Sequence, residues 1–175
     1  VGYEKAKAAY YRALAAAGIG RMSEAKILLR RASLAFGKES NLGFLGASAL
    51  LTAILAGSTI ERRRALLKAI RHFSRAQLPL WSATADIHAT FDSQLRTEAL
   101  ARLSRNKAAR GVPHLYAAWQ TRLGDARAAA GRANEASRHW EMAANCLDRI
   151  KAQLPPLGIR SQSGKAEHSP HVKLV

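Results

Sequence analysis

The chain has 175 residues, is rich in alanine, leucine and arginine, and carries a formal net charge of +16 with a pI near 11.1. Because β-branched residues are few, this length and composition predict a single all-α domain. The single cysteine, Cys146, excludes an internal disulfide and therefore a disulfide-dependent secreted scaffold. So large a positive charge predicts attraction to nucleic acid, to an anionic membrane surface or to an acidic protein.

One short unit recurs four times along the chain at a fixed spacing. Its most regular member is a glutamate, and successive copies of it are 37 residues apart, at Glu24, Glu61, Glu98 and Glu135. A fixed period of about 20 to 50 residues is typical of arrays whose units bury their apolar faces against one another. Glycine tends to precede the glutamate by four residues, and small residues tend to follow it by one and by eight. The remaining repeat-defining residues are Gly20, Ala25, Ala32, Gly57, Ala69, Ala99, Gly131, Ala136 and Ala143.

Each unit is predicted to be a helical hairpin, in chain order over residues 3–38, 41–76, 79–111 and 113–150. In the first hairpin, we expect Gly20 to end one helix and Ser23 to cap the next. In the fourth, Gly131 and Asn134 have the same expected roles between helices over 115–130 and 135–150. Glycine suits a helix end because it adopts positive φ without a Cβ clash. The small residues would then lie where paired helices approach closely, with Trp140 among the bulky residues that fill the remaining space.

The second hairpin begins with twenty uncharged residues, 41–60, followed directly by Glu61 and three arginines. This length and apolarity would suffice for a membrane span, and Gly43, Gly46 and Ala47 have the spacing of closely packed membrane helices. The segment is nevertheless in phase with the first helices of the other copies, and Gly57 falls where Gly20 and Gly131 fall. We therefore expect a buried helix of the array, with a membrane span as the alternative.

The third hairpin is the most divergent copy. Gln94 and Asn106 stand where other copies have glycine and alanine, so we expect replacement of Asn106 by alanine to be neutral or stabilising. The large aromatic side chains have spacings typical of helix packing, which predicts that they belong to the core rather than to a base-stacking surface. They are Tyr10, Tyr11, Trp81, Trp119 and Trp140.

Positive charge recurs on the second helices of the hairpins. A cation follows the repeat glutamate by seven residues in three copies, and in the second copy four cations follow i, i+4, i+7 and i+11 spacing on one helix face. Stacked hairpins would align these positions into a basic ridge on the outer side of the array, facing RNA or an acidic protein. The candidate binding residues are Arg31, Arg64, Lys68, Arg71, Arg75, Arg105 and Arg138.

No residue pattern typical of catalysis or metal binding is found. The histidines lack the spacing of paired metal ligands, and the aspartates have no partner set for acid–base chemistry. We therefore expect no enzymatic activity, no metal, no cofactor and no small-molecule substrate.

Two segments resemble the tetratricopeptide repeat family in the order and spacing of their residues. One comprises residues 123–125, 130–136 and Ala143, and the other comprises Gly20, Glu24, Ala25 and Ala32. The resemblance covers about residues 3–150. The period of 37 residues departs from the family's period of about 34, and Arg62 and Asn106 replace alanines. The resemblance implies a right-handed α-solenoid of about four hairpins over residues 1–153, which binds protein partners and catalyses no reaction.

The expected function is that of a scaffold or adaptor subunit in a larger assembly. Three alternatives stay open: an RNA-contacting component of an organellar ribosome or other ribonucleoprotein, a single-pass subunit of a membrane protein complex, and a sensory or regulatory fragment of a bacterial signalling protein. The last is suggested by residues 50–83, which resemble repeats appended to such proteins.

The two ends of the chain carry further expectations. Val1 in place of methionine indicates a processed product or a piece of a longer chain, and we expect a cytoplasmic or mitochondrial-matrix location rather than secretion. Residues 154–175 are polar and proline-bearing, and we expect a flexible tail.

Overall fold

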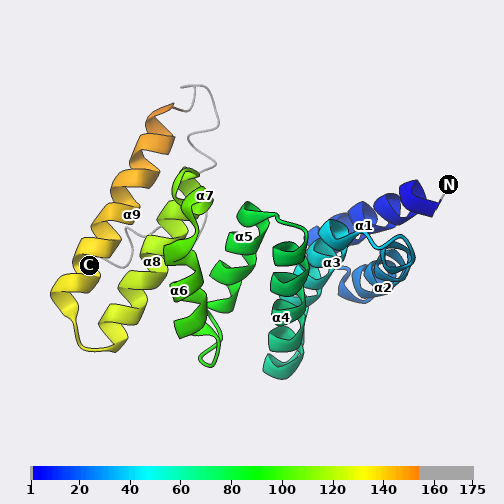
Figure 1. Ribbon diagram of the computed structural model, residues 1–175, viewed down its shortest axis with the longest axis horizontal. Helices are drawn as coiled ribbons and strands as arrows, with labels where there is room; N and C mark the ends of the chain where they lie inside the picture. The colour runs from blue at the N-terminus through cyan, green and yellow to red at the C-terminus, as the bar shows by residue number, and fades with distance from the viewer. Residues whose placement is uncertain (1, 154–175) are drawn as a thin grey trace. The chain divides into compact units, whose positions relative to one another are not determined.

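The computed structural model describes residues 2–153, which form nine α-helices and contain no strand (Figure 1). The expected all-α class is therefore confirmed for this part of the chain, whereas the expected tail over 154–175 lies outside it. The helices are α1 (Gly2–Gly18), α2 (Met22–Lys38), α3 (Leu42–Ile54), α4 (Thr59–Arg75), α5 (Pro79–Ala89), α6 (Arg96–Arg105), α7 (Lys107–Arg110), α8 (Pro113–Ala129) and α9 (Ala133–Gln153).

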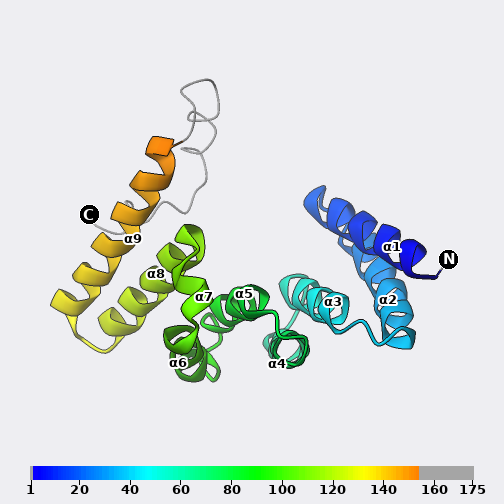
Figure 2. The same ribbon diagram turned by 45° about the horizontal axis from the view of Figure 1, so that its top comes forward.

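The helices belong to two compact units, whose boundary falls between Ala99 and Leu100, inside α6. In the first unit α1 packs on α2, α2 on α3, α3 on α4 and α4 on α5. Figure 2 shows α1 alongside α2 and α3 alongside α4. In the second unit α8 packs on both α7 and α9. Within each unit the main packing partners are thus helices that follow one another in the chain.

The repeat glutamate has one structural place in all four copies. Glu24, Glu61, Glu98 and Glu135 lie in the first turns of α2, α4, α6 and α9. A carboxylate there interacts favourably with the positive end of the helix dipole. At α4 the contacts are reciprocal, because the Ser58 hydroxyl accepts the Glu61 N–H at 3.2 Å while the Glu61 carboxylate accepts the Gly57 N–H at 3.2 Å.

The recurring small residues are the points where helices touch. Ala25, Ala32, Ala69, Ala99, Ala136 and Ala143 have no exposed surface. Phe36 and Phe73, which are also 37 residues apart, are fully buried on α2 and α4. A Cβ atom added to Gly46 on α3 would lie 2.6 Å from the Phe73 ring, so the helices meet too closely there for any side chain.

The turns follow the sequence prediction only in part. Gly20 and Gly131 have φ of 79° and 74°, as expected for glycines that end helices, but Gly57 does not adopt positive φ. Ser23 and Asn134 lie inside α2 and α9 rather than at their caps, because these helices begin at Met22 and Ala133. Those two cap predictions are wrong.

Asn106 has a role that the sequence comparison did not anticipate. It precedes α7, and its side-chain oxygen accepts the Ala109 N–H at 3.1 Å. An alanine at this position would lose that bond, so we now expect the replacement to destabilise the chain rather than to be neutral or stabilising.

Residues 41–60 form a short helix, a turn and the start of α4. Helix α3 has 13 residues, begins after the Asn41 cap and ends at Ile54. Its buried residues are Gly46, Ala47, Ser48, Ala49, Leu50, Leu51 and Ala53. In residues 2–153, none of the helices combines the length and the apolarity that crossing a membrane requires. The expected buried helix is therefore observed over residues 42–53 only, since Ile54 and residues 57–60 are exposed, and Gly46 serves helix packing against Phe73.

Candidate anion-binding surface

Helix α4 exposes a continuous line of positive side chains, here named the α4 stripe: Arg64, Lys68, Arg71 and Arg75. The opposite face of the helix is buried through Leu66, Ala69 and Phe73. No member of the stripe forms an ion pair with a carboxylate of residues 2–153. The stripe is thus a surface of one charge sign without internal neutralisation.

The corresponding line on α2 is only partly basic. Its cations Arg31 and Lys38 are exposed, but Ile27 and Leu34 at the alternate positions are exposed apolar side chains. The predicted ridge is therefore uniform on α4 and mixed with apolar residues on α2.

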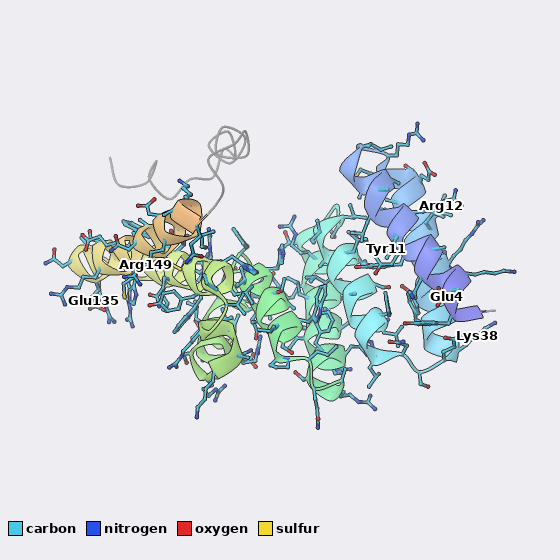
Figure 3. The ribbon with its side chains drawn as sticks, turned by 90° about the horizontal axis from the view of Figure 1, so that it is seen from above. Glu4, Tyr11, Arg12, Lys38, Glu135 and Arg149 are labelled. Carbon is cyan, nitrogen blue, oxygen red and sulfur yellow. The ribbon has the colours of Figure 1, made fainter. Side chains whose placement is uncertain are left out.

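The two predicted cations of the second unit, Arg105 on α6 and Arg138 on α9, are both exposed. On α9 exposed charges of both signs occur, among them Glu135 and Arg149, which Figure 3 labels. Glu135 also pairs with Arg127 at 3.3 Å and with Arg132 at 3.7 Å. That helix has the mixed charge of an ordinary solvated face, so the first unit carries the stronger candidate.

A depression lies between α2 and α4, with α3 as its floor. Its larger part, of about 290 Å³, and a smaller part, of about 100 Å³, share Ser33 and Thr52 as lining residues and form what we name the α2–α4 groove. One wall is formed by Lys26, Leu29, Arg30 and Ser33, the other by Glu61, Ala65 and Lys68, and the floor by Leu45, Ala49, Thr52 and Leu55.

The groove carries three cations that are not neutralised by the described chain. Lys26, Arg30 and Lys68 form no ion pair within residues 2–153. The Glu61 carboxylate already accepts the Gly57 N–H, and the Thr52 hydroxyl donates to the Ser48 carbonyl at 2.8 Å. The charged donors left for a ligand are therefore ammonium and guanidinium groups, which bind carboxylates and phosphates through charge-assisted hydrogen bonds.

Arg63 on α4, unlike the groove cations, is neutralised by an ion pair with a carboxylate. Its Nε donates to both carboxylate oxygens of Asp92, at 3.1 and 2.9 Å, and its guanidinium also contacts Gln94. Burial, which leaves the Asp92 side chain 1% exposed, would raise its pKa. Hydrogen bonds from Arg63 and from the backbone N–H groups of Gln94 and Leu95, together with the Arg63 charge, outweigh burial and hold the pKa of Asp92 below its ordinary value. This pair joins α4 to the turn after α5 and is structural.

Two aromatic residues lie outside the core, contrary to prediction. Tyr11 is 55% exposed and Trp81 is 49% exposed. Neighbouring residues of a helix point in different directions, so Tyr10 is buried on α1 while Tyr11 is exposed. The Tyr11 ring still packs edge-on against the Tyr10 ring, with 5.6 Å between ring centroids. Figure 3 labels Tyr11 on this helix. Trp81 stacks one face on Phe73 at 5.7 Å.

The other predicted core aromatics pack as expected. Tyr10 and Trp119 are buried, and Trp140 is partly buried against Gly124, where an added Cβ would meet the indole ring. Cys146 is half-buried, and its thiol donates to the Pro113 carbonyl at 3.3 Å.

The histidines form no metal centre in the described part of the chain, where no cluster of three or more possible ligands occurs. Burial is the main cause that lowers the pKa of His72, His88 and His139. Their neutral forms are favoured, and His139 Nδ1 lies 2.7 Å from the Gln120 side-chain oxygen.

Lys26 and Arg30 are the groove residues that the sequence comparison missed. Arg30 has no recurring cation, since its repeat equivalent 37 residues later is Leu67, and Lys26 recurs only as Arg63, which binds Asp92. The available signal was their i, i+4 spacing, which places both side chains on one face of α2, next to buried Leu29.

No protein-family model, curated protein or solved structure matches the chain. The resemblance to tetratricopeptide repeats therefore rests on the residues of the sequence alone.

Proposed function

We propose that this protein is a non-catalytic helical-repeat scaffold or adaptor that docks an anionic partner on α2 and α4 within a larger assembly. The 37-residue period and the packing of sequential helices within each unit support a tetratricopeptide-like right-handed solenoid as its architecture. In such arrays each unit contributes to an extended surface, which suits binding rather than catalysis.

The observation that carries the proposal is the set of cations without carboxylate partners on the α4 stripe and in the α2–α4 groove. Surfaces that only face solvent usually mix charge signs to limit self-repulsion. Here a bound polyanion would relieve the repulsion and release counterions.

The test is the salt dependence of binding to labelled poly-L-glutamate and to a single-stranded oligoribonucleotide. We expect the triple variant Lys68→Gln, Arg71→Gln, Arg75→Gln to bind more weakly and to lose about two units of the log–log salt slope for RNA. A control that removes the same charge from α1 is Lys5→Gln, Lys7→Gln, Arg12→Gln. Equal affinity of wild type and the α4 variant at low salt would overturn the proposal.

A ribonucleoprotein subunit is the second candidate, favoured by the exposed rings of Tyr11 and Trp81. Exposed aromatic rings near basic surface are the usual platforms for unstacked bases. If this candidate holds, RNA should quench Trp81 fluorescence, and Trp81→Leu should weaken RNA binding without changing the binding of poly-L-glutamate.

A further inference from the structure

We propose that the α2–α4 groove binds an acidic polypeptide segment that inserts a bulky apolar side chain between its carboxylates. This inference rests on the anionic-partner function above and specifies the chemical class of that partner.

The first argument is the apolar floor. Leu45 and Leu55 are half-buried, and Ala49 and Leu29 complete the surface beneath the rims. The floor residues are small or aliphatic apart from Thr52, whose hydroxyl already donates to the Ser48 carbonyl, so an inserted leucine or isoleucine would remove apolar surface from water on both partners. A ligand that offers only charges would leave this floor unused.

The second argument is the distribution of charge around the floor. Lys26 and Arg30 stand on the α2 wall, and Lys68 stands on the α4 wall. A segment with carboxylates on both sides of its apolar residue would therefore meet a cation from each helix. This arrangement of an apolar centre and a charged rim is typical of protein–peptide interfaces.

The third argument distinguishes a polypeptide from a nucleic acid. Glu61 lines the larger part of the groove, and a phosphodiester chain, with one charge per nucleotide, would pass this carboxylate unfavourably. A polypeptide can place an uncharged residue there. Within residues 2–153 no aromatic side chain lines the groove, so this part of the chain offers no platform there for stacking bases.

The fourth argument excludes the protein itself as the occupant. A second copy carries the same net charge of +16. Residues 154–175 contain Arg160, Lys165 and Lys173 against the single acid Glu167. Both would bring further positive charge to a groove whose three cations already outnumber its one carboxylate, Glu61, so the partner is a different and acidic chain.

The test uses fluorescence anisotropy with the full chain and three labelled probes: a glutamate-rich peptide with two leucines, the same peptide with both leucines replaced by glutamine, and oligouridylate. We expect the leucine peptide to bind about tenfold more tightly than its glutamine counterpart, as burial of a leucine side chain predicts. Ser33→Phe, which fills the groove without changing charge, should abolish that preference. Ser74→Phe, at an exposed position of α4 outside the groove, should retain it.

Two variants of equal charge separate the groove from the α4 stripe. Lys26→Gln with Arg30→Gln should weaken the leucine peptide about tenfold, whereas Arg71→Gln with Arg75→Gln should weaken both peptides equally and keep the preference. Circular dichroism melting confirms that each variant is folded. The inference would be overturned if the two peptides bound with equal affinity. It would also be overturned if oligouridylate bound more tightly than either peptide through Arg71 and Arg75. Both results would leave the proposed docking of an anionic partner standing. Absence of binding by all three probes at low salt would overturn both proposals.

Discussion

Asn41, Ser58 and Asn106 each precede a helix and accept a backbone N–H from its first turn, so their contribution to the fold is local and specific. The repeat pattern could not reveal the capping role of Asn106. A comparison of equivalent positions shows only that asparagine replaces the alanine found in other copies. The cap is visible only when the backbone is seen to leave α6 at Arg105 and re-enter a helix at Lys107.

Asn106→Ala should lower the free energy of unfolding by about 1 kcal/mol, the usual loss when a capping side chain is removed. Asn106→Asp keeps an acceptor oxygen and should retain most of the stability. Urea denaturation followed by circular dichroism measures both variants. An alanine variant as stable as the wild type would show that the cap contributes nothing.

Stability should decrease as pH falls through the ordinary histidine range. The pKa values of His72, His88 and His139 are lowered from 6.5 in the folded chain, so the unfolded chain binds more protons between the folded and unfolded values. The stabilisation is complete above the unfolded pKa and is lost as pH falls below it.

Asp92 affects stability in a separate, more acidic pH range. Its lowered pKa contributes stability above the unfolded value of 3.8, and this contribution is lost as pH falls through the lower folded pKa.

Thermal melting at several pH values between neutral and acid checks this expectation. His88 is the clearest of the three to test, because burial alone lowers its pKa. His88→Gln should therefore make the melting temperature less dependent on pH in the histidine range, while leaving the loss of stability below pH 3.8 unchanged. A melting temperature independent of pH across the histidine range would contradict the assignment.

The helices could be predicted from residues that recur at a fixed spacing in the sequence. Glu24 and Glu135 mark helix starts and Ala32 and Ala143 mark helix contacts, so the hairpins over 3–38 and 113–150 could be predicted from the sequence. The α2–α4 groove could not, because it depends on which sides of α2 and α4 face each other across α3. Its walls combine Lys68, whose positive charge recurs in three copies, with Lys26, which recurs only in Arg63, and Arg30, which does not recur.

Gly46→Ala should destabilise the α3–α4 hairpin although alanine is the better helix former. The gain in helix propensity is at most about 1 kcal/mol, while the new Cβ would lie 2.6 Å from the buried Phe73 ring and force a shift in the core. Gly37→Ala on α2, where an added Cβ meets nothing within 4 Å, should be neutral or stabilising.

The two glycine variants are compared by urea denaturation, and a double variant tests the cause. Phe73→Leu should cost less in the Gly46→Ala background than alone, because the smaller side chain relieves the clash. Additive effects of the two substitutions would show that Gly46 and Phe73 do not constrain each other.

For the whole molecule, the balance of charge opposes folding at low ionic strength. The net charge is +16, and the α4 stripe and the groove cations form no ion pairs within the described residues. The ion pairs observed elsewhere are mostly short-range surface contacts, each of which contributes little. Repulsion among the surplus cations should therefore outweigh attraction, and added salt should screen it.

We expect the melting temperature to rise between about 20 mM and about 200 mM sodium chloride, a range in which the screening length falls to below about 10 Å. Arg71→Gln with Arg75→Gln should melt higher than the wild type at low salt and respond less to added salt, because part of the repulsion has been removed. Poly-L-glutamate at low salt should raise the melting temperature of the wild type more than that of this variant, since a ligand that binds the folded state stabilises it. A melting temperature that falls with salt would show that attractive pairs dominate and that the cationic surface is already balanced within the chain.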